Sequence, residues 1–357
     1  MLLDCQDPDG AKRRLTAWWE GELADRVTWA ILAHTPEPRF APPAVPPPTD
    51  AEDRWTNAEA RFAGWLHTLA HTEYLGDAIP YFDTNIGPGS LGMLLGAHPV
   101  FDPGTVWYKP CLTRTEDAAD LTFDSTGHWF GKHMGLVRHG LERCDGRFYV
   151  SIPDLIEGLD TLAALRGNEA VLFDLHDRPA AVHRALERIT DLYFAAYDPI
   201  YNLVHDADGG CCFCAFQTWA PGRYAKLQCD FSAMLGPVHF AEFVVPYLAP
   251  QCERLDYTMY HLDGPTCVCH LDLLLAIPRL RAIQWTPGAG APGVEDPCWY
   301  DMYRRILSQK SLILLGVPLA SARGVVEALG ARGLYMTTWT DDRDGALRAL
   351  EEAERWR

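Results

Sequence analysis

A long apolar run and an excess of basic charge are both missing from this sequence. No apolar stretch approaches the roughly 20 residues that span a bilayer, and the start of the chain, MLLDCQDPDG, is acidic and unlike a signal peptide. Lysine and arginine number 31 against 48 aspartate and glutamate residues, so the formal net charge is −17. The basic residues are scattered, whereas nucleic-acid binding needs a concentrated basic face. We therefore expect a cytoplasmic protein that binds neither membrane nor nucleic acid.

Glycine-rich phosphate-binding loops are not expected either. An open nucleotide-binding sheet carries such a loop after an early strand, as G-x-G-x-x-G or G-x-x-x-x-G-K-[ST]. We identify no G-x-G-x-x-G motif after a predicted strand and no G-x-x-x-x-G-K-[ST] motif anywhere, so we expect no nucleotide cofactor.

Cysteine is abundant, but its spacing does not indicate a structural zinc site. The eleven cysteines are an odd number in a chain without a secretion signal, which favours reduced thiols. The clusters CCFC (211–214) and CVC (267–269) do not form two spaced pairs. Most of these thiols are expected to pack in the core. The alternative is a zinc site that combines His261 with one or two of Cys214, Cys229, Cys267 and Cys269.

The chain divides into an irregular N-terminal segment and a long repetitive part. A helix is predicted near 11–24, a strand near 26–33 and a second helix near 54–74. The segment 35–50, TPEPRFAPPAVPPPTD, is rich in proline and cannot be helical, so it is predicted to be a surface connector. We expect residues 1–50 to pack as an extension on a domain formed by residues 51–357.

From residue 147 onward, short apolar strands alternate with helices. Strands are predicted near 147–152, 211–216, 256–262, 281–285, 311–316 and 333–338. Helices are predicted near 157–165, 178–205, 237–254, 266–276, 299–309, 320–329 and 343–355. Repeated βα units imply a parallel sheet. Without a phosphate loop, the closed arrangement is favoured: an α/β fold with a single (β/α)8 TIM barrel, whose functional groups lie at the carboxyl ends of the strands.

Polar and aromatic side chains recur at the expected strand ends. The clearest case is YHLDG (260–264), where alternation places His261 and Asp263 on one face and Gly264 permits a tight turn. Two interpretations stay open. In the first, His261 is a core imidazole and Asp263 caps the helix near Pro265. In the second, the pair acts in proton transfer or metal binding.

The segment 217–248 is predicted to be a long connection between a strand and a helix, and such loops often carry functional groups. It contains Trp219, Arg223, Tyr224 and Asp230. Arg223 either clamps a substrate carboxylate or pairs with a surface carboxylate.

Two runs, SAMLGPVHFAEFVVPYLAPQCERLDYTMYHLDGP (232–265) and LLLAIPRLRAIQW (273–285), resemble the uroporphyrinogen decarboxylase superfamily. The resemblance spans roughly 130–355 and implies a single (β/α)8 barrel. It also implies either porphyrinogen decarboxylation or methyl transfer that serves corrinoid proteins and thiol cofactors. In the zinc methyltransferases, an H-x-C-G motif supplies the ligand histidine, which His261 matches. Asp263 stands where they have cysteine, their later cysteine is absent from GLYMTTWT (333–340), and the arginine-rich signature of the decarboxylases is missing.

These observations favour a methyltransferase acting on a small molecule in the barrel mouth, with zinc as a candidate metal and a corrinoid protein as a candidate donor and partner. We expect His261, Asp263 and Asp230 to be catalytic, and His261, Asp263, Cys229 and Cys269 to be candidate metal ligands. The expected substrate-binding residues are Asp83, Asn85, Trp107, Gln217, Trp219, Arg223, Tyr224, Gln284, Trp285 and Trp339.

Two alternatives are kept. The first is a metal-independent decarboxylase or lyase, in which Arg223 grips a carboxylate and Asp230 or Asp83 stabilises an intermediate. The second is a non-catalytic ligand-binding barrel. The oligomeric state, including a homo-oligomer, is open.

Overall fold

Seven strands form the main sheet of the protein. The structure is a computed structural model that describes residues 4–356. The strand order is β2-β1-β13-β12-β11-β10-β9, and all neighbours are parallel except β1 and β2. The strands are β1 (Thr28–His34), β2 (Thr72–Gly76), β9 (Tyr224–Gln228), β10 (Tyr257–Asp263), β11 (Ala282–Thr286), β12 (Ser311–Leu314) and β13 (Leu334–Thr340).

Six short strands form three two-stranded sheets. β3 (Tyr81–Phe82) pairs in parallel with β6 (Tyr149–Val150), β4 (His98–Phe101) pairs antiparallel with β5 (Val106–Lys109), and β7 (Cys211–Cys212) pairs antiparallel with β8 (Trp219–Ala220). A parallel bridge between Ile152 and Phe213 extends the β3–β6 pair. Within residues 4–356, no strand ladder joins these pairs to the main sheet. The fold is therefore α/β with a large parallel sheet, and the closed eight-stranded barrel stays a prediction.

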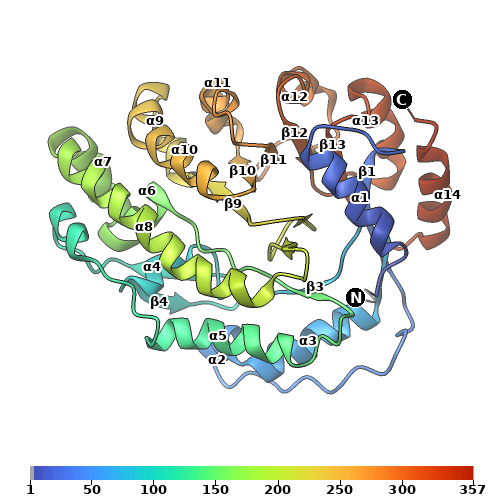
Figure 1. Ribbon diagram of the computed structural model, residues 1–357, viewed down its shortest axis with the longest axis horizontal. Coiled ribbons are helices and arrows are strands. Elements are labelled where there is room, and N and C mark those ends of the chain that lie inside the picture. The colour runs from blue at the N-terminus through green and yellow to red at the C-terminus, as the bar shows by residue number, and fades with distance from the viewer. Residues whose placement is uncertain (1–3, 357) are drawn as a thin grey trace.

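Helices surround the strands. In Figure 1, α9 to α13 lie above the strands, and α3 and α5 lie below them. The helices are α1 (Pro8–Trp19), α2 (Ala51–Thr56), α3 (Ala58–Ala70), α4 (Ser90–Leu94), α5 (His128–Leu141), α6 (Gly158–Arg166), α7 (Asn168–Asp177), α8 (Pro179–Val204), α9 (Pro237–Phe243), α10 (Val245–Arg254), α11 (Leu271–Leu275), α12 (Tyr300–Leu307), α13 (Ala322–Leu329) and α14 (Arg343–Ala353). The short 3-10 helices are η1 (Thr115–Asp120), η2 (Asp230–Met234), η3 (Pro265–His270), η4 (Pro297–Trp299) and η5 (Leu319–Ser321). In the part of the chain that the structure describes, none of the helices has the length and apolar character needed to cross a membrane.

Three differences from the sequence-based expectations concern the main sheet. The helix expected at 54–74 ends at Ala70, and the chain continues as β2, antiparallel to β1. β1 itself lies between β2 and β13 in the main sheet, so part of the expected N-terminal extension belongs to the sheet. β9 occupies the start of the segment that we expected to be a long connection.

Helix α1 packs at the amino ends of the parallel strands. The Trp18 indole N–H donates to the Leu312 carbonyl at 3.2 Å, and the Trp18 ring lies 5.3 Å from that of Tyr335. Trp19 lies 5.1 Å from the ring of Tyr224, the first residue of β9. Both tryptophans are buried. Two buried tryptophans therefore fill this end of the sheet, whereas the carboxyl ends carry polar groups.

Candidate active site

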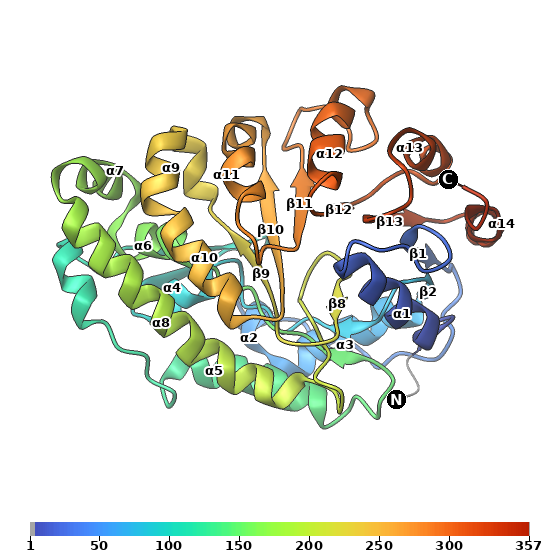
Figure 2. The ribbon, with the colours of Figure 1, turned by 45° about the horizontal axis from the view of Figure 1, so that its top comes forward.

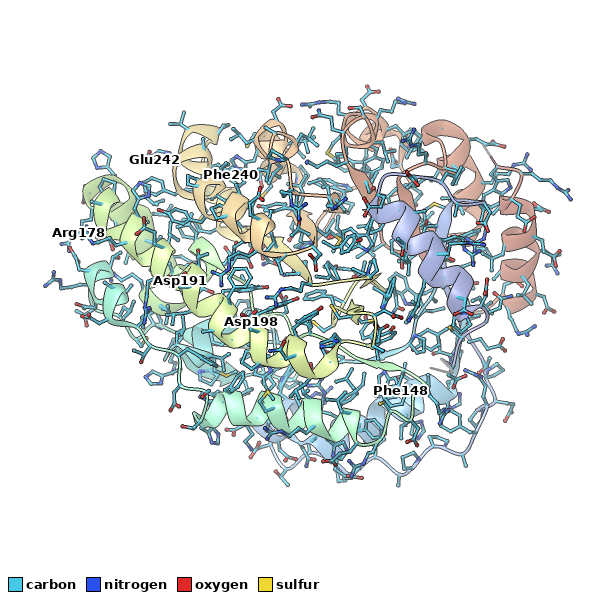
Figure 3. The ribbon with its side chains drawn as sticks, in the orientation of Figure 1. Phe148, Arg178, Asp191, Asp198, Phe240 and Glu242 are labelled. Atoms are coloured by element: carbon cyan, nitrogen blue, oxygen red, sulfur yellow. The ribbon has the colours of Figure 1, made fainter. Side chains whose placement is uncertain are left out.

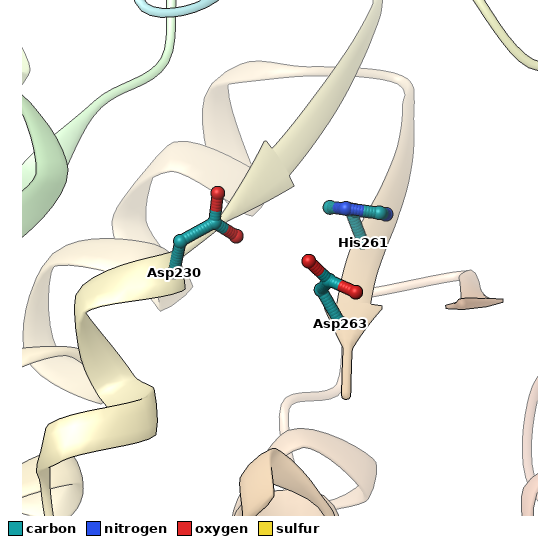
Figure 4. Close-up of side chains that lie close together, drawn as sticks. All are labelled: Asp230, His261 and Asp263. Carbon is teal, nitrogen blue, oxygen red and sulfur yellow. The ribbon is translucent and has the colours of Figure 1, made fainter. Parts of the chain in front are cut away.

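Three side chains meet at the carboxyl ends of β9 and β10. His261 and Asp263 lie on one face of β10 because strand side chains alternate, and Asp230 is the first residue of η2, just after β9. Figure 4 shows Asp230 facing the other two side chains. One ligand atom from each residue lies within 4.8 Å of the others. The structure thus brings together the three residues that we expected to be catalytic.

Gln284 fixes the orientation of the His261 ring. Gln228, His261 and Gln284 occupy one row across β9, β10 and β11, which Figure 2 shows side by side. The Gln284 amide nitrogen donates to the Trp285 carbonyl at 2.6 Å and to Thr286 Oγ1 at 3.0 Å. Its Oε1 therefore faces His261 Nδ1 and accepts a hydrogen bond from it. This assigns the proton to Nδ1 and leaves Nε2 with a free lone pair.

Phe216 stacks on the face of this imidazole. The two rings are 5.4 Å apart with an interplanar angle of 24°. Phe216 and Gln217 both have left-handed backbones, with φ of 65° and 55°. The Tyr335 hydroxyl donates to the Gln217 carbonyl at 2.5 Å, whereas the buried Gln217 Oε1 has no partner within residues 4–356. Strain of this kind persists only where the surroundings impose it, and it concentrates at functional sites.

Asp263 does not serve as a helix cap. The short helix η3 follows it, but the N-cap position of η3 is Gly264 and carries no side-chain cap. The interpretation in which Asp263 caps this helix is therefore wrong. Gly264 has φ of 80°, the left-handed backbone that the turn after β10 requires.

A buried lysine lies beneath the site. Lys226 is 3% exposed, and its side chain points to the same face of β9 as Gln228, two residues away. Its Nζ lies 2.8 Å from Asp154 Oδ1 and also donates to Gln228 Oε1. Burial alone would lower the pKa of Lys226, but Asp154 and Glu157 raise it above its usual value. Sequence reasoning missed Lys226 because β9 was not predicted.

The titratable groups show a site with little positive charge. Burial and the nearby Lys226 lower the pKa of His261, so the imidazole is neutral at pH 7. Burial raises the pKa of Asp230, although His261 and Lys226 oppose this. Burial also raises the pKa of Glu157 to about 8, and burial together with the Asp230 charge raises that of Asp160 to about 6. Burial is the main cause in each case, and repulsion between the Asp160 and Asp230 charges adds to it for Asp160.

A cavity of about 600 Å³ adjoins these groups. Asp160, Gln228 and Asp230 line it, and so do Trp107 and Tyr108 of the β4–β5 hairpin. Of the expected substrate-binding residues, Trp107 is therefore placed at a cavity that shares Asp230 with the catalytic trio.

No protein-family model matches the chain, and no curated protein matches it. Solved structures do match, among them a methyltransferase from Methanosarcina mazei. The alignment covers 97% of this chain and 98% of that one, with a TM-score of 0.59 and 13% sequence identity. The chain shares the fold of this methyltransferase. At such low identity the likeness concerns the fold alone.

Two expected substrate-binding residues stabilise the loop after β3. Asp83 accepts a hydrogen bond from the Asn85 amide at 2.7 Å and lies 3.3 Å from the Arg61 guanidinium. Asn85 Oδ1 accepts from the Asp154 amide at 3.1 Å. Trp339, at the end of β13, is 57% exposed.

Arg223 does not reach the site. Together with Trp219 and Tyr224 it lies at the amino end of β9, far along the strand from Asp230. Its guanidinium pairs with Asp198 of α8, which Figure 3 labels. Of the two interpretations of Arg223, the structure shows the ion pair with a carboxylate of the chain.

Trp285 points away from the catalytic trio. It follows Gln284 on β11 and therefore faces the opposite side of the sheet. There it is fully buried, and its ring lies 5.1 Å from that of Trp299. The structure does not bring Trp285 to the cavity.

The cysteines also lie outside the cluster of potential ligands. Among residues 4–356, only Asp230, His261 and Asp263 form a group of His, Cys, Asp or Glu side chains that could hold a metal. Cys229 is buried, which raises the pKa of its thiol well above the usual value. Cys269 is exposed and donates to the Thr266 carbonyl at 3.2 Å. The expected cysteine ligands thus do not belong to the group of potential ligands around His261. The third member of that group is Asp230.

A glycine motif follows a strand, contrary to the expectation that no G-x-G-x-x-G motif does so. GPGSLG (87–92) has the G-x-G-x-x-G spacing and lies between β3 and α4. However, α4 has only five residues, and its Ser90 and Leu91 amides already donate to the Asp154 and Leu155 carbonyls. These amides are therefore not available to a phosphate.

Proposed function

We propose that this protein is a methyltransferase of the uroporphyrinogen decarboxylase-like type, with its chemistry at Asp230, His261 and Asp263. It moves a methyl group from a small-molecule donor to a thiol. The observation that carries the proposal is the convergence of these three side chains at the carboxyl ends of parallel strands, where such folds place their active sites. The fold shared with a methyltransferase supports it.

The three residues fit a metal ion. His261 Nε2 keeps its lone pair because Nδ1 is bonded to Gln284, as is usual for metal-binding histidines. Asp263 accepts no side-chain hydrogen bond from the residues that the structure describes, so its oxygens are available. One imidazole and two carboxylates form a three-ligand set that suits zinc with an open fourth position. When bound, the metal lowers the pKa of an acceptor thiol and keeps it as a thiolate.

The side chains themselves position the reactants. Phe216 stacks on the His261 ring and Gln284 binds its Nδ1, so the two side chains fix the orientation of the ring. Without a metal, His261 Nε2 takes the proton of the acceptor thiol, and Asp230 and Asp263 stabilise the resulting imidazolium. The bond between the methyl carbon and the donor breaks, and its electron pair stays with the donor. A bond forms between the methyl carbon and the sulfur of the acceptor.

Two alternatives to this proposal are less well supported. A corrinoid protein is the alternative methyl donor, which the family resemblance implies. The decarboxylase alternative required Arg223 to bind a substrate carboxylate. Arg223 instead pairs with Asp198 at the amino end of β9, so it does not bind a substrate at the catalytic trio.

Elemental analysis of the purified protein tests the metal. We expect one zinc per chain, retained in His176→Ala, an exposed control, and absent from His261→Ala. Gln284→Met should weaken zinc binding about tenfold or more in a chelator competition, because the Nδ1 partner is lost. Gln309→Met is the matched control. A protein that takes up no metal would overturn the metal assignment. If neither His261→Ala nor Asp263→Asn changes S-methylation of thiols, the function itself is wrong.

A further inference from the structure

The cavity beside the catalytic trio has aromatic walls. Trp107 and Tyr108 come from β5, and Phe231 and Met234 come from η2. Trp107 is 67% exposed and Met234 is 48% exposed, although both are large apolar side chains. Exposed aromatic faces next to a cavity are suited to contact a ligand.

The same cavity is acidic. Asp160 and Asp230 line it, and none of its lining residues among 4–356 is lysine, arginine or histidine. A second large cavity, at the amino ends of the strands, is lined by four basic residues and one acidic residue, which are Arg279, Arg281, Lys310, Arg332 and Glu20. The acidic character is therefore a property of this cavity and not of every cavity in the molecule.

Neither carboxylate has an ion-pair partner in the described part of the chain. Asp160 accepts hydrogen bonds from the Asp230 and Phe231 amides, each at 2.8 Å. The Gln228 side-chain amide donates to Asp230 at 2.9 Å and to Asp160 at 3.3 Å. The nearby Lys226 pairs with Asp154 instead. The carboxylates are thus held in place by neutral donors and neither forms an ion pair, although the charges of His261 and Lys226 oppose the rise in the pKa of Asp230.

The backbone around the cavity is also strained. Ile156 lines the cavity with φ of 55°, which is a rare conformation for a β-branched residue. Of the four non-glycine residues with positive φ within 4–356, Ile156 lines the cavity, and Phe216 and Gln217 lie at His261. Strained backbone therefore lies both at the cavity and at His261 of the trio, and strain of this kind is concentrated at functional sites.

We propose that this cavity binds a small methylated ammonium cation. Trp107 and Tyr108 would contact its methyl groups by cation–π attraction, and Asp160 and Asp230 would balance its charge. Where a metal occupies the trio and uses Asp230, Asp160 still supplies one negative charge to the cavity.

The role of this cation as methyl donor rests on the proposed function. One C–N bond of the quaternary ammonium breaks, and a C–S bond forms to the acceptor thiolate. The nitrogen keeps the electron pair and leaves as a neutral tertiary amine, so charge and atoms balance. Binding of the cation does not depend on this step.

Calorimetric titration with choline tests the binding. The matched probe is the neutral analogue of choline in which carbon replaces nitrogen, because it has the same shape without the charge. We expect choline to bind about tenfold more tightly than the analogue. Trp107→Leu should remove most of this difference without affecting folding, because Trp107 is exposed. Phe173→Leu, which changes an exposed aromatic side chain of α7 outside the cavity, should leave the difference intact.

Equal affinity for the two probes, no binding of either, or an unchanged preference in Trp107→Leu would overturn the inference. The outcomes separate it from the proposed function. Choline that binds but donates no methyl group to a thiol contradicts only its role as donor. Methyl transfer from another donor to a thiol, without choline binding, contradicts only the inference about the cavity.

Discussion

At the scale of single residues, Glu157 shows how burial controls the charge near the site. It is 3% exposed, its Oε1 accepts from the Gln228 amide at 2.9 Å, and its Oε2 has no partner within 4–356. Burial raises its pKa from 4.5 to about 8. Between these values the folded state binds more protons than the unfolded state, so stability falls as pH rises through this range and is constant above it.

Glu157→Gln should remove this pH dependence, because glutamine has the shape of the protonated acid at every pH. We expect the variant and the wild type to have similar melting temperatures near pH 4.5. Above pH 8 the variant should be more stable, by an amount on the order of a few kcal/mol. Thermal unfolding across the pH range measures the difference. Glu352→Gln, an exposed control on α14, should show none, and parallel profiles for Glu157→Gln and wild type would contradict the prediction.

At the scale of elements, the apolar pattern predicted five strands of the main sheet but not β2 and β9. β10 and β11 were expected at 256–262 and 281–285 and are observed one residue later. In β9, the buried residues Lys226 and Gln228 are polar and interrupt the continuous apolar run by which a buried parallel strand is usually recognised. The placement of Trp285 was predictable, since the alternation that joins His261 and Asp263 also separates Gln284 from Trp285. The pairings of Gln284 with His261 and of Lys226 with Asp154 depend on contacts between strands, which one sequence does not encode locally.

Trp19 is one of the two buried tryptophans through which helix α1 contributes to stability. Its ring contacts Tyr224 and Tyr257, and its indole N–H donates to the Trp219 carbonyl at 2.9 Å. Trp19→Ala should lower the free energy of unfolding by about 3–5 kcal/mol, because it leaves a cavity at the amino ends of the strands. Urea denaturation measures this. The exposed Trp339→Ala should change stability by no more than about 0.5 kcal/mol, and similar losses in both variants would contradict the assigned role of Trp19.

At the scale of the whole molecule, the charge is distributed unevenly between the two ends of the sheet. The net charge is −17, the carboxyl-end cavity contains Asp160 and Asp230, and the amino-end cavity contains four basic residues. A protein field of one sign attracts small ligands of the opposite sign and favours them where that sign is concentrated. The two cavities should therefore select ligands of opposite charge.

This distribution predicts that salt weakens cation binding at the carboxyl end. Raising the ionic strength from about 0.01 M to about 1 M shortens the screening length from about 30 Å to about 3 Å. The long-range attraction of the negative surface is then lost, while contacts with Trp107 and the carboxylates persist. We expect the affinity for choline to fall severalfold in calorimetric titrations over this range, and the affinity for its neutral analogue to stay constant or rise slightly. An equal effect of salt on both affinities would contradict the prediction that the electrostatic field of the protein attracts the cation to this cavity.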